Sequence, residues 1–509
     1  MLQSNVVFHL VQVTQWFFLG YFVALNGIYL LLTLISLGFL PRFIQKQVIH
    51  TFPQPETGFE PPITLIVTAY NEEAVIIPTV HALLQLDYHE FEILIVNDGS
   101  KDRTLEVLTN EFDLELLPVA FRQRINHKPV KAVYQSKVHA NLRVIDKENG
   151  GSKADASNAG INGARYGLFM PLDADTILER NCLNLMVQPY LYNPDTVGVG
   201  GTVRILNGCQ VQDGALTKIG LPKNLLALFQ VLEYTRAFLS GRVGWNYFNS
   251  LPLISGAFGL FKKEAVIEVG GYSHKSLGED MDLVLRIHRH FRLNGKPYRV
   301  DFVVDPVCWT EAPETFSVLK KQRVRWQRGL FDCLWENRKL LFHPRSGGVG
   351  WGSFPFLLFL EGISPVIEVA GHLFFITCYF LGIINGEGAL AFLMLSFGTG
   401  FLLSVSSILL EEITFQTYPR KKDLLILIGG AFIENFGYRQ MMSLWRLEGI
   451  VKWLLRTKSS WGAMTRNASW AAPAAPAEAP KRSALPLAPA SADGKKTPST
   501  ADEKPLENA

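Results

Sequence analysis

Residues 63–100 read ITLIVTAYNEEAVIIPTVHALLQLDYHEFEILIVNDGS. Two short runs of β-branched and apolar residues, Ile63–Ala69 and Phe91–Asn97, each lead into a polar turn and then a helix-like stretch. Similar strand-like runs recur at 141–146, 168–172 and 197–205. Strands that alternate with helices are typical of a mostly parallel sheet with crossover connections. The region from Pro61 to about Pro313 is therefore predicted to be a soluble α/β domain.

The composition places this α/β region beside membrane segments. The chain has 509 residues, of which 48% are hydrophobic and 19% charged, so it is long enough for a catalytic domain and several apolar segments. Its net charge of +3 is too small to indicate a nucleic-acid-binding protein. The five cysteines form no C-x-x-C pair, which argues against a zinc site or a disulfide framework and favours a reducing environment.

The N-terminal segment, residues 1–41, contains no Asp, Glu, Lys or Arg. Its almost wholly apolar part, Trp16–Leu40, is long enough to cross a hydrocarbon core of about 30 Å as a helix. Arg42 and Lys46 follow, and basic residues concentrate on the cytosolic side of a membrane. We therefore expect residues 1–41 to form a transmembrane helix and residues 42–313 to lie in the cytosol.

Apolar segments return near the C-terminus, at residues 354–384, 389–410 and 424–445. The first two are expected to span the membrane, with the loop near Glu387 outside, because basic residues flank the pair but do not separate it. Glu434 and Arg439 interrupt the third segment, which could span, re-enter or lie in the interface. We expect four transmembrane helices, give or take one.

These patterns predict five parts of the chain. They are residues 1–41, an N-terminal transmembrane helix; 42–313, the α/β domain; 314–348, a basic and aromatic interface helix; 349–466, a C-terminal transmembrane region; and 467–509, an Ala/Pro-rich tail too polar and irregular in composition to bury a core.

Two segments of the α/β region leave alternatives open. The stretch 112–140 is basic and irregular, and we interpret it as a solvated loop that could instead touch phosphates or lipid. The apolar residues of 225–239 share one helical face, which fits either a helix on the membrane surface or an ordinary core helix.

Polar turns follow the first two predicted strands. Tyr70 and Glu72 come after the first strand, and Asp98 and Gly99 come after the second. In sheets of this kind the ligand site lies beyond the carboxyl ends of the strands. A carboxylate at Asp98 can accept hydrogen bonds from a nucleoside, and Gly99 permits a tight turn. N-D-G-S alone is a generic turn, but two such turns on one sheet edge carry more weight.

Two further motifs indicate a diphosphate. Gly150-Gly151-Ser152-Lys153-Ala154-Asp155 opens a helix, whose free N–H groups and lysine favour phosphate, although a plain Gly-rich turn with Asp155 as a dipole partner also fits. Asp173 and Asp175 follow the strand-like run 168–172, and two such carboxylates can hold one hard divalent cation. A diphosphate leaving group needs a cation of this kind.

A third pair of motifs indicates the reacting groups. Glu279 and Asp280 open a helix-like stretch, where a carboxylate could act as a general base or simply cap the helix. Gln322-Arg323-Val324-Arg325-Trp326 offers an amide, two cations and an indole; arginine suits pyrophosphate and indole suits the apolar face of a sugar, although such residues also occur at membrane interfaces.

Taken in order, these motifs resemble the membrane-bound processive members of glycosyltransferase family 2, the cellulose, hyaluronan, chitin and poly-N-acetylglucosamine synthases. The resemblance covers roughly residues 51–461. It implies a GT-A fold, a Rossmann-like mixed α/β sheet, on the cytosolic side of a bacterial inner (plasma) membrane. It also implies amphipathic interface helices and an α-helical transmembrane bundle.

The resemblance further implies a UDP-sugar donor, with Tyr70, Glu72 and Asp98 at the uridine. Lys153 and Asp155 would lie near the nucleotide.

Asp173 and Asp175 would hold the diphosphate and its Mg²⁺ or Mn²⁺. Asp280 would be the base, with Glu279 beside it.

Gln322, Arg325 and Trp326 would cover the diphosphate and the acceptor end, and Ser255 and Gly256 would line the glycan acceptor.

The implied activity is inverting elongation of a β-linked polysaccharide, processive and coupled to translocation. The implied partners besides donor and acceptor are membrane lipid and export or periplasmic subunits. A transferase that adds single sugars to a lipid, or a catalytically dead scaffold or export subunit, remains an alternative. Two residues depart from the family pattern: Gly278 stands where many members have Thr, and Ser152 lengthens the usual G-G-K-A-D.

Overall fold

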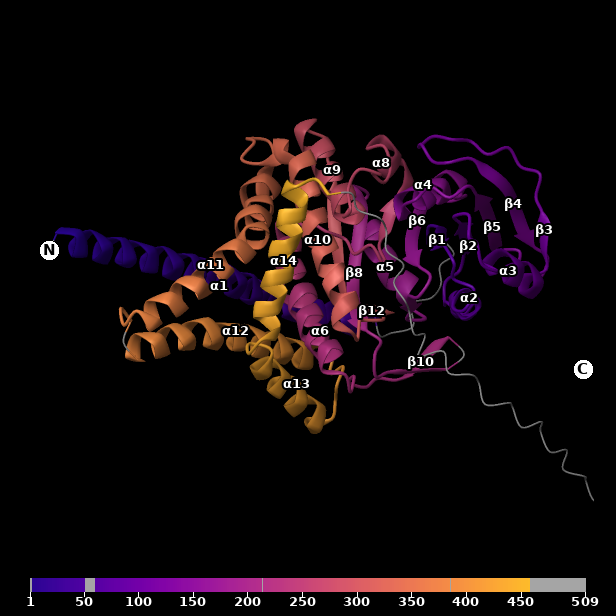
Figure 1. Ribbon diagram of the computed structural model, residues 1–509. Coiled ribbons are helices and arrows are strands. Elements are labelled where there is room, and N and C mark those ends of the chain that lie inside the picture. The colour runs from indigo at the N-terminus through magenta and orange to yellow at the C-terminus, as the bar shows by residue number, and fades with distance from the viewer. Residues whose placement is uncertain (1, 51–59, 213, 385, 458–509) are drawn as a thin grey trace, which may run out of the picture. The chain divides into compact units, whose positions relative to one another are not determined.

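In the computed structural model, which describes residues 2–50, 60–212, 214–384 and 386–457, a mixed sheet of ten strands forms the α/β region (Figure 1). The strand order is β3-β4-β5-β2-β1-β6-β11-β8-β12-β7. The predicted tail, residues 467–509, lies outside the described residues.

The middle of the sheet is parallel. β1 (Ile63–Ala69) pairs with β2 (Phe91–Asn97) on one side and β6 (Leu168–Asp173) on the other, and β5 (Leu142–Lys147) pairs with β2. These ranges differ from the predicted ones by at most one residue at either end. The register sets Ala69 opposite Asn97, so the turns that follow β1 and β2 leave the sheet at one edge.

Antiparallel strands flank this parallel middle. β11 (Leu260–Lys262) lies antiparallel between β6 and β8 (Thr196–Ile205), whereas β12 (Arg299–Thr310) runs parallel to β8 and antiparallel to β7 (Ile177–Leu178). A separate hairpin joins β9 (Gln210–Gln212) to β10 (Ala215–Lys218). The mixed sheet implied by the family resemblance is confirmed.

The solvated loop predicted for residues 112–140 is wrong in part. β3 (Leu114–Leu116) and β4 (Val130–Ser136) lie within it and extend the sheet antiparallel to β5. These strands lie at the edge of the sheet, where most of their side chains are at least partly exposed. A half-exposed strand tolerates charged residues such as Lys131, so it lacks the continuous apolar run that marks a central strand.

Helices cover the sheet and close its core. They are α2 (Ile76–Leu84), α3 (Thr104–Phe112), α4 (Lys153–Gly163), α5 (Cys182–Tyr192), α8 (Lys263–Glu268) and α9 (Glu279–Leu293). The strand residues Ile63, Leu65 and Ile66 are fully buried in this core. At Gly160, α4 approaches β1 so closely that a Cβ atom would lie 2.3 Å from Cγ2 of Ile66. This close packing sets the position of α4 on the sheet. It thereby places the start of the helix near the carboxyl ends of the parallel strands.

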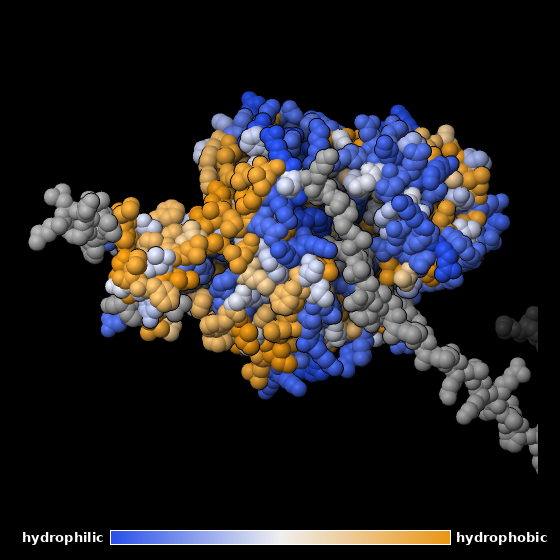
Figure 2. All heavy atoms as spheres, viewed as in Figure 1, coloured by the Kyte–Doolittle hydropathy of each residue, from blue (hydrophilic) through white to orange (hydrophobic). Residues whose placement is uncertain are grey.

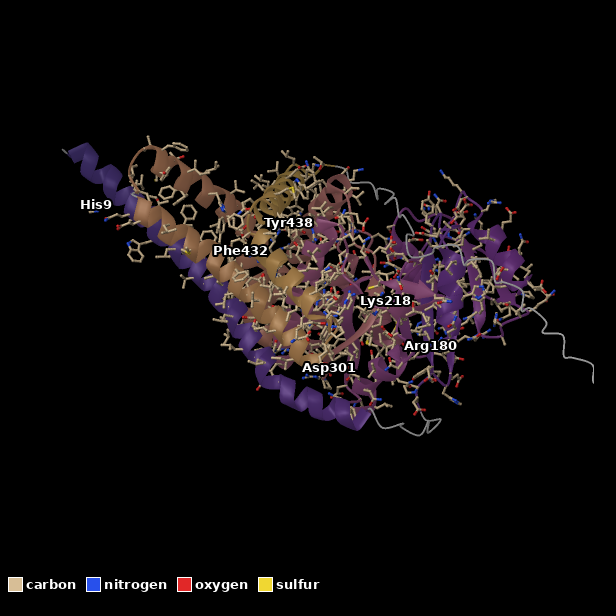
Figure 3. The ribbon with its side chains drawn as sticks, turned by 90° about the horizontal axis from the view of Figure 1, so that it is seen from below. His9, Arg180, Lys218, Asp301, Phe432 and Tyr438 are labelled. Atoms are coloured by element: carbon tan, nitrogen blue, oxygen red, sulfur yellow. The ribbon has the colours of Figure 1, made fainter. Side chains whose placement is uncertain are left out.

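The helical part of the chain begins with α1 (Leu2–His50) and continues after β10. Its elements are α6 (Leu225–Thr235), η1 (Arg236–Arg242), α7 (Val243–Tyr247), α10 (Phe316–Glu336), η2 (Arg338–Leu340), η3 (Val349–Ser353), η4 (Phe356–Gly362), α11 (Ser364–Phe380), α12 (Gly386–Thr414), α13 (Lys421–Ile433) and α14 (Tyr438–Leu454). α12 lies beside α1, although far from it in sequence (Figure 3).

Three helices of the described part are long and apolar enough to cross a membrane. They are His9–Phe39, Val349–Phe380 and Phe397–Thr414. Figure 2 shows apolar surface gathered over the helical part and hydrophilic surface over the sheet domain. Three candidate spans lie within the expected range of three to five transmembrane helices. The spans His9–Phe39 and Val349–Phe380 follow the predicted segments 16–40 and 354–384 closely.

The third C-terminal segment, 424–445, divides into α13 and α14. Gly437, with a φ of 96°, precedes α14, and buried Glu434 ends α13. The carboxylate of Glu434 accepts hydrogen bonds from Arg236 at 2.6 Å and from Arg439 at 2.8 Å. The charges that interrupt this segment are therefore paired with one another inside the protein.

α6 packs against α13 as a core helix. Leu228 and Leu232 are buried, and a Cβ atom at Gly430 would lie 3.3 Å from Cδ2 of Leu228. Phe229 contacts Tyr438 with 4.6 Å between ring centroids. Two alternatives were open for residues 225–239, a helix on the membrane surface and a core helix. These contacts are those of a core helix.

Candidate active site

The two turns predicted at the nucleotide end of the sheet interlock. The backbone N–H of Asp98 donates to the carbonyl of Ala69 at 2.9 Å, and that of Asn71 donates to Oγ of Ser100 at 3.0 Å. Asn71 has a φ of 57°, a left-handed conformation that asparagine tolerates. Tyr70, 44% exposed, stands at this edge. The first two motifs thus form one surface.

Glu72, the third residue predicted for this surface, contributes its backbone to the turn. Its N–H donates to Oγ1 of Thr104 at 2.9 Å, which joins the turn after β1 to the start of α3.

A buried lysine, which sequence reasoning missed, connects the second and third motifs. Lys147 is fully buried, and its ammonium pairs with the carboxylate of Asp98 and, at 2.5 Å, with that of Asp155. Oδ1 of Asp98 also accepts from the N–H of Gly150 at 3.1 Å. One cation between two buried carboxylates holds the turns together, since either carboxylate alone would be costly to bury. The sequence held one indication of this role: Lys147 is a charged residue at the carboxyl end of the buried strand β5, where ligand-site residues are expected.

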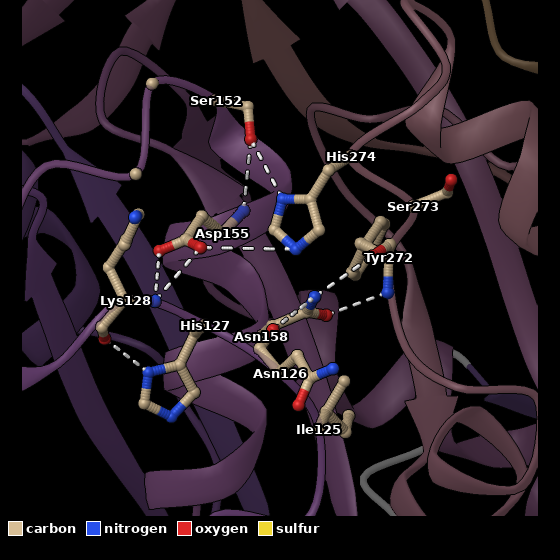
Figure 4. Close-up of polar contacts among 12 residues, drawn as sticks. Ile125, Asn126, His127, Lys128, Ser152, Asp155, Asn158, Tyr272, Ser273 and His274 are labelled. Carbon is tan, nitrogen blue, oxygen red and sulfur yellow. Dashed lines mark hydrogen bonds and ion pairs between the residues drawn. The ribbon is translucent and has the colours of Figure 1, made fainter.

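Asp155 is enclosed by protein donors (Figure 4). Both of its carboxylate oxygens accept from the N–H of Lys128 at 3.1 Å, and Nε2 of His274 lies 4.0 Å from Oδ2. Oγ of Ser152 accepts from the N–H of Asp155 at 3.4 Å and contacts Nδ1 of His274 at 3.3 Å. The predicted helix start is confirmed, with Ser152 as the N-cap of α4. The added Ser152 therefore supplies the cap.

Lys153, the first residue of α4, reaches the aspartates of the third motif. Its ammonium pairs with Oδ1 of Asp173 and donates to the carbonyl of Gly256 at 2.6 Å. Burial lowers the pKa of Lys153, but the carboxylates of Asp173, Glu279 and Asp280 outweigh burial and raise that pKa above its ordinary value. The lysine remains a cation in the middle of the site.

Asp173 and Asp175 lie at the end of β6, as predicted. Asp173 is partly exposed and Asp175 is buried. The described residues contain no group of three or more His, Cys, Asp and Glu side chains that could hold a metal ion.

The Glu279-Asp280 motif begins α9 and contacts the predicted acceptor segment. Oδ2 of Asp280 accepts from the N–H of Gly256 at 2.9 Å, and Oδ1 accepts from the N–H of Met281 at 2.8 Å. Burial, and then the charge of Asp280, raise the pKa of Glu279 to about 7, against the lowering effect of Lys153. Glu279 is therefore about half protonated near neutral pH, beside the carboxylate of Asp280 at the start of α9.

The close approach of α10 explains why residue 278 is a glycine. A Cβ atom at Gly329 would lie 2.7 Å from the backbone nitrogen of Gly278, and one at Gly278 would lie 3.3 Å from Sγ of Cys333. Sγ of Cys333 also donates to the carbonyl of Gly278 at 3.1 Å. Two glycines let the turn before Asp280 rest directly on α10, which leaves little room for the Thr of other family members.

The Q-x-x-R-W motif lies on α10. Arg323 pairs with Glu233 of α6 and lies 4.5 Å from the ring centroid of Trp326, so it belongs to the helix packing. Trp326 is 40% exposed. The charge of Arg325 lowers the pKa of Glu279, which puts its guanidinium within electrostatic reach of the base motif. Oε1 of Gln322 is shielded from solvent without a hydrogen-bond partner in the described part of the chain.

The predicted acceptor-lining pair is Ser255 and Gly256. The backbone of Gly256 hydrogen-bonds to both Lys153 and Asp280. The carbonyl of Ser255 accepts from the N–H of Phe258 at 3.1 Å, which closes the turn that carries Gly256. The structure thus brings the third and fourth motifs together around one backbone segment.

Comparison with known proteins adds to this geometry. A family profile described as "Glycosyltransferase like family 2" matches residues 61–329, slightly more than half of the chain. The poly-β-1,6-N-acetyl-D-glucosamine synthase of Staphylococcus aureus strain COL is 30% identical over 272 residues, which are 53% of this chain and 55% of the relative. The synthase of the same name from Staphylococcus epidermidis is 29% identical over 272 residues, with the same shares. The match thus spans about half the length of these curated relatives.

Solved structures offer more distant likenesses. A mannosyltransferase from Pyrobaculum calidifontis in complex with GDP-Man and Mn²⁺ aligns at 16% identity and a TM-score of 0.46, covering 85% of this chain and all of that one. Residues 1–349 of TarS from Staphylococcus aureus in complex with UDP-GlcNAc align at 13% identity and a TM-score of 0.36, covering 74% of this chain and 92% of that one.

Proposed function

The chain belongs to glycosyltransferase-like family 2, and from this we propose that it is an inverting glycosyltransferase that elongates a β-linked polysaccharide from a UDP-sugar. One observation carries the proposal. The backbone of Gly256 accepts from Lys153 beside Asp173 and donates to Asp280, so a diphosphate-side cation and a carboxylate base flank one short segment. A sugar transferred between two such groups would have its leaving group on one side and its attacking hydroxyl on the other.

The donor proposed for the first test is UDP-N-acetylglucosamine, because the curated relatives are named for a polymer of that sugar. Tyr70 would contact the uracil with its exposed ring, and the turn that begins at Glu72 would border it. Asp98 would reach the uridine through Oδ2, since Oδ1 is bonded to Lys147 and Gly150.

Mg²⁺ or Mn²⁺ fits the D-A-D carboxylates, because both ions prefer oxygen ligands and accept water and phosphate oxygens in the remaining positions. Asp173 and Asp175 would hold the ion. When bound, it would neutralise charge on the departing diphosphate. Lys153 would add a fixed cation to the same group, since its ammonium already contacts Asp173.

Transfer would proceed by a single in-line displacement. The acceptor hydroxyl attacks the anomeric carbon and gives its proton to Asp280, while the bond from that carbon to the diphosphate breaks and UDP leaves. One displacement inverts the configuration, so an α-linked donor yields a β-linkage. The hydrogen bond from the N–H of Gly256 would orient the carboxylate of Asp280 toward the acceptor.

The acceptor would lie against α10. Trp326 would stack on the apolar face of its terminal sugar, and Gln322 and Arg325 would contact polar groups of the acceptor and the diphosphate. The resemblance of Gln322-Arg323-Val324-Arg325-Trp326 to the motif of processive family members favours a retained polymer over a single transfer.

The proposed location is a bacterial inner membrane with the α/β domain in the cytosol. The basic Arg42 and Lys46 after the first span, and the apolar helical surfaces, support this orientation. Elongation would be processive, with residues 314–348 at the interface and residues 349–466 in the bilayer passing the product toward export or periplasmic subunits.

The test is a screen of UDP-N-acetylglucosamine, UDP-glucose and UDP-glucuronate with the purified full chain, measuring UDP release with and without Mg²⁺ or Mn²⁺. We expect metal-dependent release and a product that grows in length with time. A discrete glycolipid would favour the lipid-acceptor alternative, and release from none of the three donors would favour the inactive scaffold and contradict the proposal.

A further inference from the structure

The π-helical segment η1 carries two arginines with opposite surroundings. Arg236, at its start, donates from Nη1 to Glu434 at 2.6 Å and to Ser404 at 2.7 Å. Arg242, at its end, has its guanidinium 3.7 Å from the ring centroid of Phe238. Nη1 of Arg242 is shielded from solvent and has no hydrogen-bond partner within the described residues. π-Helical turns are rare and occur often at functional sites.

An unpartnered buried donor on a cation is costly, so this group calls for a partner that the described residues do not supply. Leaving one buried N–H unsatisfied costs about 1–3 kcal/mol, and more on a charged group. Burial lowers the pKa of Arg242 to about 10, with Asp280 and then Tyr234 acting in the opposite direction. The guanidinium therefore stays charged at neutral pH and lies within electrostatic reach of the proposed base.

The surroundings of Arg242 differ from those of Lys153, the other cation near Asp280. Lys153 responds to the carboxylates of Asp173, Glu279 and Asp280, whereas Asp280 is the one carboxylate that acts on Arg242 among the described residues. η1 also packs against α1 and α12, the helices of the membrane part. Arg242 thus belongs to a segment that packs against the membrane helices, and it lies within electrostatic reach of the proposed base.

We propose that Arg242 binds the terminal sugar of the acceptor, donating hydrogen bonds from Nη1 to a hydroxyl or acetamide oxygen while that sugar's attacking hydroxyl meets Asp280. The inference rests on the proposed function. It adds an acceptor-binding residue outside the motifs of the α/β domain. The ring of Phe238, whose centroid lies 3.7 Å from the guanidinium carbon, contacts the group without any glycan.

The experiment compares Arg242→Met and Arg242→Lys with Arg236→Met, a matched control on the same segment whose arginine is fully paired. Each variant of the purified full chain is measured for binding of a β-1,6-linked N-acetylglucosamine pentasaccharide in the presence of UDP, for UDP affinity, and for Tm without ligands. We expect Arg242→Met to weaken pentasaccharide binding roughly tenfold or more, as for loss of a hydrogen bond to a charged group. UDP affinity should change less than about twofold and Arg242→Lys should restore part of the loss.

The ligand-free Tm separates binding from structure. Arg242→Met should leave the Tm unchanged or higher because it removes an unsatisfied buried donor, whereas Arg236→Met should lower it because Glu434 loses a partner. Unchanged pentasaccharide binding in Arg242→Met, a loss of UDP affinity, or a fall in Tm as large as that of Arg236→Met would each overturn the inference. A wild-type chain that binds the pentasaccharide but transfers no sugar would contradict the proposed function and leave the Arg242 comparison valid.

Discussion

The backbone N–H of Gly256 donates to Oδ2 of Asp280 at 2.9 Å, and the carbonyl of the same Gly256 accepts from Lys153. The hydrogen bond orients the carboxylate that is proposed to take the acceptor proton. A carboxylate with one oxygen fixed in this way needs little reorganisation when the acceptor arrives, which is the advantage of a preorganised site. The backbone of Gly256, a residue without a side chain, thus connects Lys153 of α4 to Asp280 of α9.

Gly256→Ala should therefore lower kcat with little effect on UDP affinity. A Cβ atom at this position would lie 3.1 Å from Oδ2 of Asp280 and would force the carboxylate to move. A displacement of this kind costs up to about 10²-fold in rate. The measurement is steady-state UDP release together with UDP titration calorimetry.

Gly167→Ala is the matched control, because a Cβ atom there meets nothing within 4 Å. Equal kcat values for the two alanine variants would show that the position of Asp280 is not set by Gly256.

Asp280→Asn should abolish transfer and leave UDP binding intact. The amide keeps the shape and can still accept the hydrogen bond from Gly256, but it cannot take the proton, and general-base catalysis contributes about 10²–10⁴-fold. Sugar transfer and UDP affinity are measured on the same preparation. Near-normal turnover in this variant would remove Asp280 from the proposed role.

Glu279 should make the protein less stable as the pH rises from about 4.5 to about 7. Its pKa is about 7 in the folded protein and is ordinarily 4.5, so the folded state holds a proton that the unfolded state has released across this interval. Glu279→Gln removes that linkage. We expect the variant to unfold roughly 3–8 °C above the wild type at pH 8 and to differ little from it at pH 4.5.

Scanning calorimetry at several pH values measures this difference. A Tm difference that is the same at both ends of the pH range would mean that Glu279 titrates near its ordinary pKa.

The central strands could be predicted from sequence because burial on both faces demands continuous apolar, β-branched residues. Ile63–Ala69 and Phe91–Asn97 stand where the pattern indicated. β4 was missed because this strand, second from the edge and partly exposed, accepts Lys131 and Gln135 among its apolar residues. The start of α4 was predictable, since Gly-Gly followed by Ser152 supplies a cap that needs only local contacts.

The site was predictable as a set of motifs but not as a set of contacts. The order of the carboxylates indicated the residues that would gather at one edge. Lys147 pairs with Asp98 across 49 residues, and Gly256 meets Asp280 across 24, so neither pairing leaves a local trace. The close approach of Gly329 to Gly278 depends in the same way on how α10 packs.

Removal of divalent metal by EDTA should stop sugar transfer, and Asp175→Asn should weaken UDP binding in Mn²⁺ by roughly tenfold or more, because one carboxylate ligand of the ion is lost. Binding without metal should change little. Calorimetry of UDP with and without Mn²⁺ measures both, and exposed Asp195 provides the control Asp195→Asn. Full activity in EDTA would contradict the proposed role of the metal ion in sugar transfer.

Lys147→Met should destabilise the fold by about 3–5 kcal/mol, because it leaves the buried carboxylates of Asp98 and Asp155 without their shared cation. Adding Asp98→Asn should recover part of the loss, since one uncompensated charge disappears. Lys131→Met is the control, as Lys131 is half exposed and lies 4.0 Å from Asp146, a pair worth at most about 1 kcal/mol. Denaturant unfolding of all three variants decides the matter. If Lys147→Met lost no more stability than Lys131→Met, the lysine would not be what holds the turn after β2 to the start of α4.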